Sequence, residues 1–192
     1  TEGITKITAA DFEYANATDH TIKLLGRSRA IDDNTAEVMV APFLLSKEHP
    51  LAMVHDVFNA VFVTGNMLGD SMYYGRGAGK LPTASAVVSD VVDCARHQGK
   101  VIMCFWDKEE VKLADIGEAE RSFFIRAKAG AEDAVTAAFP GGRMVHLKDR
   151  KEDFGYFTQS MKEKDFQAKY EALGEQMLGR IRLVEEKMIC QK

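Results

Sequence analysis

The chain has 192 residues, 46% of them hydrophobic, which is enough to bury a substantial core as one or two domains. Its net charge of -4 arises from interspersed acidic and basic residues, so the sequence offers no basic footprint for nucleic acid or an anionic membrane. No apolar run approaches the roughly 20 residues that span a bilayer, and no signal-peptide pattern opens the chain. We expect a cytoplasmic protein with neither nucleic acid nor membrane as a partner.

The cysteines and histidines show no metal-binding pattern. Cys94, Cys104 and Cys190 are odd in number and lack metal-ligand spacing, so we expect neither a disulfide framework nor a zinc site. Cys94 and Cys104 are interpreted as small buried hydrophobic side chains. The five histidines are scattered singly, and none is assigned to metal binding or catalysis.

The first elements in the chain are a helix and two strands. Thr8 is a good N-cap, and Asp11 three residues later completes an acidic capping box, which predicts a helix ending near Thr18. Alternating apolar residues predict paired antiparallel strands over 20–30 and from 35 onward. Pro42 cannot donate to a ladder, so we expect a bulge, an edge or the end of regular pairing there.

A helical turn, a hairpin and a longer helix follow. The sequence predicts a short turn over 47–55, strands at 60–63 and 71–74, and a hairpin loop around Gly65 and Gly69. The next helix is predicted over 82–97, with Pro82 in its first turn and Gly99 just beyond its end. Its apolar residues recur at three- and four-residue steps, so we expect this stripe to face a core: Ala84, Val87, Val88, Val91 and Ala95.

The last part of the chain has its own order of elements. An apolar run at 101–105 is followed by a charged stretch, 107–120, with the composition of an exposed connector. Beyond it, the pattern predicts a strand at 121–128, a helix at 130–139, strands at 143–148 and 154–161, a helix at 162–177 and a strand at 180–184. This β-α-β-β-α-β order is ferredoxin-like.

The turn between the hairpin and the helix is the candidate binding site. Gly75, Gly77 and Gly79 allow special backbone angles and close approach of another molecule. Arg76 and Lys80 flank the turn, and no carboxylate lies in the first turn of the helix, which leaves an anion-binding geometry. A glycine-rich turn can also be a plain connection between strand and helix.

The longer string resembles a known family. Residues 73–79, Tyr-Tyr-Gly-Arg-Gly-Ala-Gly, followed by Pro-Thr-Ala-Ser-Ala-Val-Val-Ser-Asp, resemble the segment with which homoserine dehydrogenases return to their nucleotide-binding domain. The resemblance spans residues 1 to about 97 and also rests on five shorter stretches: Glu2-Gly3-Ile4, 22–26, 40–42, 49–52 and 59–61.

The resemblance implies an α+β fold and an enzyme. Members interconvert L-aspartate 4-semialdehyde and L-homoserine with NAD or NADP, a step of threonine and methionine biosynthesis. It implies cofactor contacts at Gly75, Gly77, Ala78, Gly79 and Thr83. The family's dinucleotide fingerprint and catalytic Asp and Lys precede the Glu-Gly-Ile stretch, so no catalytic residue is assigned here and we expect these residues alone to be inactive. Lys6 and Lys23 are not substitutes on motif grounds.

The resemblance also implies a division into domains and an assembly. Residues 1–106 correspond to the end of the catalytic and dimerisation domain with its return helix 82–97, residues 107–120 to a connector, and residues 121–192 to an ACT-like regulatory domain. We expect a dimer or higher homo-oligomer, because the strands within 35–46 and 58–74 carry more apolar residues than one helix could cover. A nucleotide-binding domain upstream of Thr1 is the second expected partner.

The ACT-like part departs from its family. ACT domains commonly have an Asp-x-x-Gly or Asp-x-Pro-Gly turn before the first helix, whereas residues 128–133 read Lys-Ala-Gly-Ala-Glu-Asp. We therefore expect threonine to bind weakly or not at all, and this domain can equally contribute only packing or an oligomer interface. The alternative function is a stand-alone amino-acid-sensing module without chemistry; the sequence encoded directly upstream of Thr1 discriminates between the two.

Overall fold

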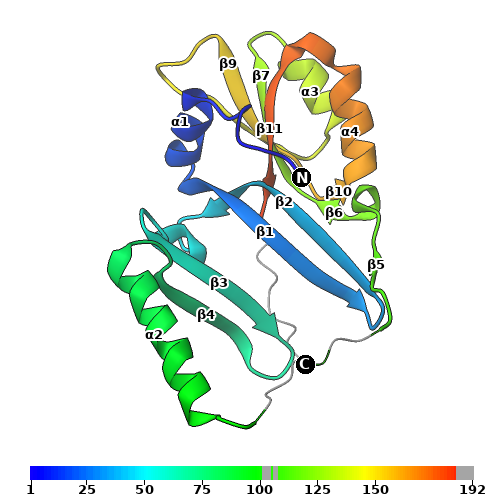
Figure 1. Ribbon diagram of the computed structural model, residues 1–192. Helices are drawn as coiled ribbons and strands as arrows, with labels where there is room; N and C mark the ends of the chain where they lie inside the picture. The colour runs from blue at the N-terminus through cyan, green and yellow to red at the C-terminus, as the bar shows by residue number, and fades with distance from the viewer. Residues whose placement is uncertain (101–104, 106–107, 185–192) are drawn as a thin grey trace. The chain divides into compact units, whose positions relative to one another are not determined.

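A computed structural model describes residues 1–100, 105 and 108–184 of the chain. The fold is α+β, with mostly antiparallel strands (Figure 1). The chain divides into two compact units, which we call the sheet unit, Thr1–Lys47 with Glu110–Lys192, and the hairpin unit, Glu48–Glu109. The predicted domains 1–106, 107–120 and 121–192 stay a prediction, whereas the packing groups the first 47 residues with the C-terminal part.

The sheet unit is built on one large sheet with the strand order β1-β2-β11-β7-β9-β8, beside which β5 pairs with β2. The antiparallel pairing of β1 with β2 confirms the first predicted hairpin. Parallel pairing of Phe43 and Leu44 with Arg182 and Leu183 joins this hairpin to the C-terminal strands. The strands of the sheet are β1 His20–Asp32, β2 Thr35–Ser46, β5 Lys112–Leu113, β7 Phe123–Lys128, β8 Arg143–Val145, β9 Asp153–Phe157 and β11 Met177–Leu183.

Helices lie on both faces of this sheet, with α1 on one side of β7 and β11 and α3 and α4 on the other (Figure 1). The α-helices are α1 Ala9–Ala17, α3 Glu132–Ala138 and α4 Glu163–Ala172, and the shorter elements are the 3-10 turns η2 Ile116–Glu118 and η3 Gly174–Gln176 and the paired strands β6 Glu120–Arg121 and β10 Met161–Lys162. From β7 to β11, with the short β10 set aside, the order is the predicted β-α-β-β-α-β.

Side chains on the two faces of β7 pack into two different hydrophobic cores, because successive residues of a strand point to opposite faces. Phe123 and Ile125 lie in the cluster that contains Phe166 of α4, whereas Phe124 lies in the cluster that contains Tyr14 of α1. On the α1 side, a Cβ added to Gly155 would lie 2.7 Å from the Phe124 ring and 2.9 Å from that of Tyr14. Only glycine lets these two rings pack over β9.

Pro42 does not interrupt β2, contrary to the prediction. The strand runs without a register shift from Ala36 to Ser46, and Pro42 lies opposite Leu24. The carbonyls of Val40 and Leu44 accept hydrogen bonds from Glu2 and Val184, so every second residue directs its backbone away from β1. Pro42 shares this parity, and its missing N–H therefore costs no bond to β1.

Three other boundaries differ from the sequence prediction. The helix predicted to reach Met177 ends at Ala172, because Gly174 has φ +54° and Met177 begins β11. The strands predicted at 143–148 and 154–161 end at Val145 and Phe157. Within the charged stretch, Lys112 donates to Asn34 O at 2.8 Å, so the described part of 107–120 adds a strand to β2 and is not a plain connector. The apolar run 101–104 lies outside the described residues.

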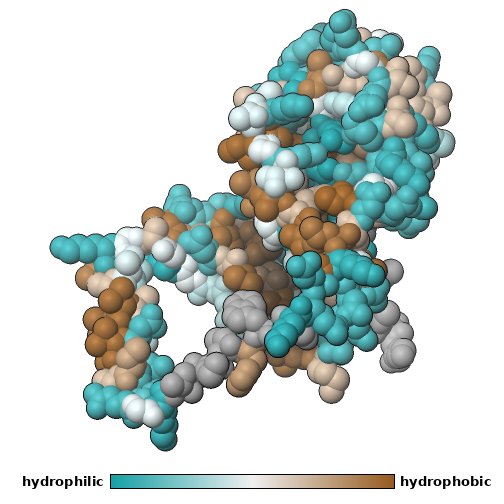
Figure 2. All heavy atoms as spheres, turned by 45° about the vertical axis from the view of Figure 1, so that its right-hand side comes forward, coloured by the Kyte–Doolittle hydropathy of each residue, from teal (hydrophilic) through white to brown (hydrophobic). Residues whose placement is uncertain are grey.

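The hairpin unit contains η1 Pro50–Met53, β3 Phe58–Gly65, β4 Gly69–Arg76 and α2 Lys80–Arg96. The antiparallel β3–β4 pairing and the helix confirm those predictions. The expected burial of the α2 stripe is wrong for the described residues: Val87 and Val91 are 56% and 62% exposed, and Cys94 is exposed. Figure 2 shows hydrophobic side chains on the open surface of this helix. The helical period fixes which face is apolar but not what covers it.

Candidate functional site

The five residues predicted to bind a cofactor lie together where β4 passes into α2. Gly75 lies next to the end of β4 and pairs with Asn59 of β3. Gly77, Ala78 and Gly79 form the connection, since β4 ends at Arg76 and α2 begins at Lys80. Thr83 follows in the first turn of α2, where its N–H donates to Gly79 O at 3.1 Å.

Gly79 sets the entry into the helix. Its φ of +116° and ψ of 154° lie in a region that is essentially reserved for glycine. As the N-cap residue it offers no side chain to the first N–H groups, and no acidic residue lies in the first turn of this fully described helix. The positive end of the helix dipole is therefore left without a carboxylate from α2 itself.

Gly77 and Gly75 have different surroundings. A Cβ on Gly77 would collide with the Asn59 side chain, whose amide donates to Val57 O at 3.4 Å, while Gly77 N donates to the same carbonyl at 3.3 Å. A Cβ on Gly75 would meet no heavy atom within 4 Å. A side chain at position 77 would thus displace the exposed Asn59 amide, whereas internal packing gives no reason for glycine at position 75.

Aromatic rings hold one of the two flanking cations. The Arg76 guanidinium carbon lies 5.1 Å from the centre of the Phe58 ring, and Phe58 stacks on Tyr74 with 4.8 Å between ring centres. Lys80 begins the helix and is exposed. The turn therefore combines bare backbone, an open helix N-terminus and two cations, which together suit a phosphate group.

The described residues offer neither a metal centre nor a membrane span. Within 1–100, 105 and 108–184, no three His, Cys, Asp or Glu side chains are grouped so that they could hold a metal ion. Over the same residues, every helix is too short or too polar to cross a bilayer. Near the turn, the chemistry available is recognition of an anion by backbone and cationic groups.

A second cluster of charged side chains lies in the sheet unit, and it was not predicted from the sequence. Arg126 of β7 donates to Asp11 of α1 at 2.9 Å and to Asp153 of β9 at 3.1 Å, and all three residues are buried. Arg182 of β11 contacts Glu163 of α4 and donates to Glu2 at 2.7 Å. The partners lie up to 180 positions apart, so local patterns could not pair them.

Comparison with known proteins gives the same family throughout. The family model for homoserine dehydrogenase matches residues 1–92. The homoserine dehydrogenase of Synechocystis is 48% identical over 95 residues, covering 48% of this chain and 22% of its own length. That of Helicobacter pylori is 36% identical over 134 residues, covering 70% of this chain and 32% of its own. The crystal structure of a homoserine dehydrogenase from Thiobacillus denitrificans has a TM-score of 0.76 at 28% identity, over 96% of this chain and 47% of that one.

These relatives are all named as dehydrogenases, and the α+β fold of this chain matches that of a solved one. Within that class, the chain belongs to the homoserine dehydrogenase family. It spans less than half the length of each of the three relatives. The structural match extends over the sheet unit as well as the hairpin unit, because it covers 96% of the chain.

Proposed function

We propose that these residues form part of an NAD(P)-dependent homoserine dehydrogenase, which interconverts L-aspartate 4-semialdehyde and L-homoserine in the cytoplasm. The observation that carries the proposal is the turn of residues 75–83, whose open backbone and uncompensated helix N-terminus fall inside the part matched by the family. The family implies a nicotinamide cofactor, and the turn is suited to the anionic part of such a molecule.

Each residue of the turn has a role in this proposal. Gly75 leaves space beside β4 for the cofactor, and Gly77 and Ala78 present backbone to it. Gly79 starts α2 without a blocking side chain, and Thr83 adds a hydroxyl in the first turn. Arg76 and Lys80 supply positive charge. The nicotinamide group, when bound, supplies or accepts the hydride.

No side chain of this chain is assigned to acid–base catalysis. Lys23 lies within β1, and Lys6 lies just ahead of α1 in the sheet unit. We propose instead that the catalytic Asp and Lys come from sequence preceding Thr1, in keeping with the family order of motifs. The role of the present residues is to bind and orient cofactor and substrate.

The proposal is tested with the product of the native gene and with residues 1–192 alone. We expect the native product to reduce NADP⁺ or NAD⁺ in the presence of L-homoserine, followed by absorbance of the reduced nicotinamide, and residues 1–192 alone to show no turnover. A native product without this activity overturns the proposed function. Turnover by residues 1–192 alone overturns the assignment of the catalytic residues to preceding sequence.

Gly75→Ala in the native product tests the turn. Because a Cβ there meets open space within the protein, the substitution should leave the fold intact while crowding the cofactor. We expect a rise in the cofactor KM of about tenfold or more, which corresponds to about 1.4 kcal/mol. Gly3→Ala is the matched control, since its Cβ also meets open space. An unchanged cofactor KM in folded Gly75→Ala contradicts the contact. Gly77 serves less well, because its substitution also displaces Asn59.

We also propose that the C-terminal β-α-β-β-α-β part is an ACT-like module. Its sheet order, β11-β7-β9-β8, places the first and last strands of the module side by side at its centre and edge, as in a ferredoxin-like fold. The short α3 and the divergent turn before it support a structural role in place of threonine binding.

A further inference from the structure

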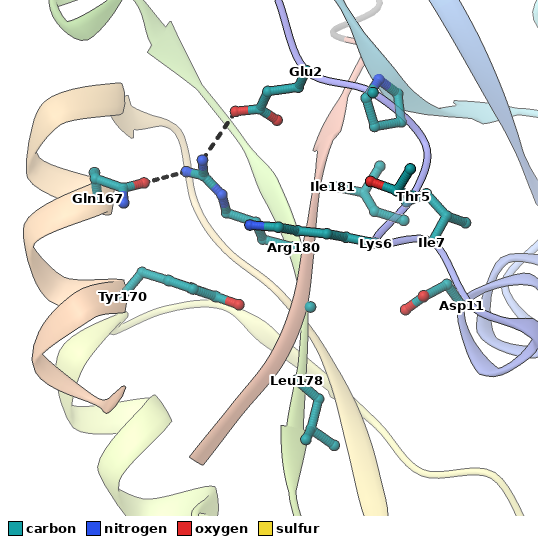
Figure 3. A pocket seen from close by; sticks show the side chains of 13 residues that line it. Glu2, Thr5, Lys6, Ile7, Asp11, Gln167, Tyr170, Leu178, Arg180 and Ile181 are labelled. Carbon is teal, nitrogen blue, oxygen red and sulfur yellow. Dashed lines mark hydrogen bonds and ion pairs between the residues drawn. The ribbon is translucent and has the colours of Figure 1, made fainter. Parts of the chain in front are cut away.

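A cleft of about 400 Å³ opens in the sheet unit between the N-terminal segment and the pair α4 and β11 (Figure 3). Its walls come from two parts of the chain that are distant in sequence, residues 2–11 with Pro42 and residues 167–181. Side chains labelled Lys6, Asp11 and Tyr170 are directed into it, with Arg180 beside them (Figure 3). The size suits a small metabolite.

The part of β11 that lines the cleft contains an irregularity in its pairing with β7. The register of β11 against β7 shifts between Met177 and Gly179, which is a β-bulge. A Cβ on Gly179 would lie 3.5 Å from Asp11 Oδ1, so the bare backbone there faces α1 closely. On the opposite wall, the Tyr170 ring packs against Phe166 and lies 5.7 Å from the Arg180 guanidinium carbon. The aromatic wall is therefore fixed by the core.

Both carboxylates of the cleft are already neutralised. Asp11 is buried, and its oxygens accept hydrogen bonds from Arg126 at 2.9 Å and from the Thr8 hydroxyl at 2.8 Å. Glu2 accepts from Arg182 at 2.7 Å and from Arg180 at 3.0 Å. The Glu2 pKa lies below its usual value, first because of the hydrogen bond from Arg182. Neither carboxylate needs a further cation.

Two donors are left over. Among the described residues, Lys6 has no carboxylate within ion-pair distance, and the Tyr170 hydroxyl has no hydrogen-bond partner. Burial is the main cause that raises the Tyr170 pKa, so this hydroxyl stays protonated at neutral pH and can donate. Lys6 is solvated, whereas Tyr170 is half-buried. An ammonium and a phenol that converge on one cleft match a carboxylate group.

We propose that this cleft binds the carboxylate group of a small polar metabolite, with Lys6 and Tyr170 as donors and the Arg180 guanidinium alongside. The site goes beyond the proposed dehydrogenase function, because it uses no residue of the turn at 75–83. Arg180 also contacts Gln167 of α4 and Glu2 of the N-terminal segment. A bound carboxylate would therefore lie beside a side chain that links these two parts of the chain.

The test uses residues 1–192 and two probes of equal shape, sodium L-lactate and its uncharged amide, L-lactamide. We expect lactate to shift the amide resonances of Lys6, Tyr170 and Arg180 saturably at millimolar concentration, and lactamide to leave them unchanged. Lys6→Met should weaken lactate binding about tenfold, because it removes the charged donor. Tyr170→Phe should weaken it about threefold to tenfold by removing one donor.

Lys148→Met is the control, because Lys148 is an exposed lysine that does not line the cleft. Lactate binding should be unchanged in this variant. The proposal is overturned if lactate gives no saturable shifts up to about 20 mM, or if Lys6→Met binds it as tightly as the unchanged chain. Equal binding of lactamide also overturns it. No cofactor takes part, so these outcomes leave the dehydrogenase proposal untouched.

Discussion

Among the described residues of the sheet unit, Asp153 is the acidic side chain that accepts hydrogen bonds from the largest number of residues. Its carboxylate accepts hydrogen bonds from Tyr14 at 2.9 Å, Arg126 at 3.1 Å and Arg150 at 2.8 Å, and the residue is 2% exposed. Burial raises the Asp153 pKa, but the hydrogen bonds from Arg150, Tyr14 and Arg126 lower it more, so the pKa lies below its usual value. The same burial is the main cause that raises the Tyr14 pKa.

Asp153→Asn should therefore destabilise the fold in a pH-dependent way. Because the folded-state pKa is depressed, the carboxylate stabilises the fold above its unfolded pKa of about 3.9, and that stabilisation is lost as pH falls through the folded value. At pH 7 we expect a loss of about 3 kcal/mol in the free energy of unfolding, since buried Arg126 and half-buried Arg150 each lose one charged partner. Urea unfolding between about pH 3 and 7 measures both effects.

Asp149→Asn is the control for that measurement, because Asp149 is exposed and lies in the loop just before β9. It should unfold like the unchanged chain at every pH. A free energy of unfolding that falls equally with pH in the unchanged chain and in Asp153→Asn would show that other carboxylates carry the acid sensitivity.

At this scale, the sequence predicts interactions only within a few positions. The Thr8–Asp11 capping box was predicted, and Asp11 Oδ2 does accept from Thr8 N at 2.8 Å. The other oxygen of Asp11 binds Arg126, which is 115 positions away. Since the two residues meet only through the packing of α1 on β7, neither this pair nor the cleft beside it could be read from spacing.

Among the elements, the turn between β7 and α3 bears on whether the proposed ACT-like module can hold an amino acid. Gly130 has φ +93°, and its N–H donates to the Glu132 carboxylate at 2.7 Å. The α-helix that follows has only 7 residues. Glu132 thus occupies a backbone donor that a ligand carboxylate would need, and its negative charge would repel that carboxylate.

We expect titration calorimetry with L-threonine to show no micromolar isotherm. A weak millimolar heat that disappears in Lys6→Met would belong to the cleft at α4 and β11 and would leave this expectation intact. A one-to-one isotherm of micromolar affinity, retained in Lys6→Met, would show that the divergent turn still holds threonine. Lys148→Met again serves as the unaffected control.

Element types followed from periodicity, whereas their ends and their coverage did not. The helix beginning at Glu163 was predicted with its apolar face, and Phe166 is fully buried as that face requires. Its end was misplaced because Met177 continues the helical spacing although it belongs to β11. The α2 stripe has the same kind of spacing and remains exposed. A period therefore indicates an apolar face but carries no information about the partner that buries it.

For the whole molecule, the first 47 residues join the C-terminal part through the parallel pairing of β2 with β11 and the packing of α1 on β7. Because Phe43 and Leu44 of β2 pair with Arg182 and Leu183 of β11, residues 1–47 share a sheet with the C-terminal strands. Parallel pairing joins strands that are far apart in the chain, and both strands read as ordinary apolar segments. The sequence could thus supply the elements and the family, but not this partnership.

We expect the interface of the predicted homo-oligomer to lie on the hairpin unit. One face of the β3–β4 hairpin is open, with Val61 62% and Tyr73 71% exposed, while Phe62 on the other face packs against His49. In a two-stranded sheet both strands are edge strands, and an open apolar face beside them favours association.

We therefore expect light scattering to find residues 1–192 as at least a dimer at about 10 μM, in the affinity range of a stable interface. Val61→Glu should shift the mass to that of a monomer, because it would bury an unpaired charge. Asn66→Glu, which adds the same charge in the exposed loop of the hairpin, should not. A monomeric unchanged chain, or a Val61→Glu variant that associates as well as Asn66→Glu, would remove this face as the interface.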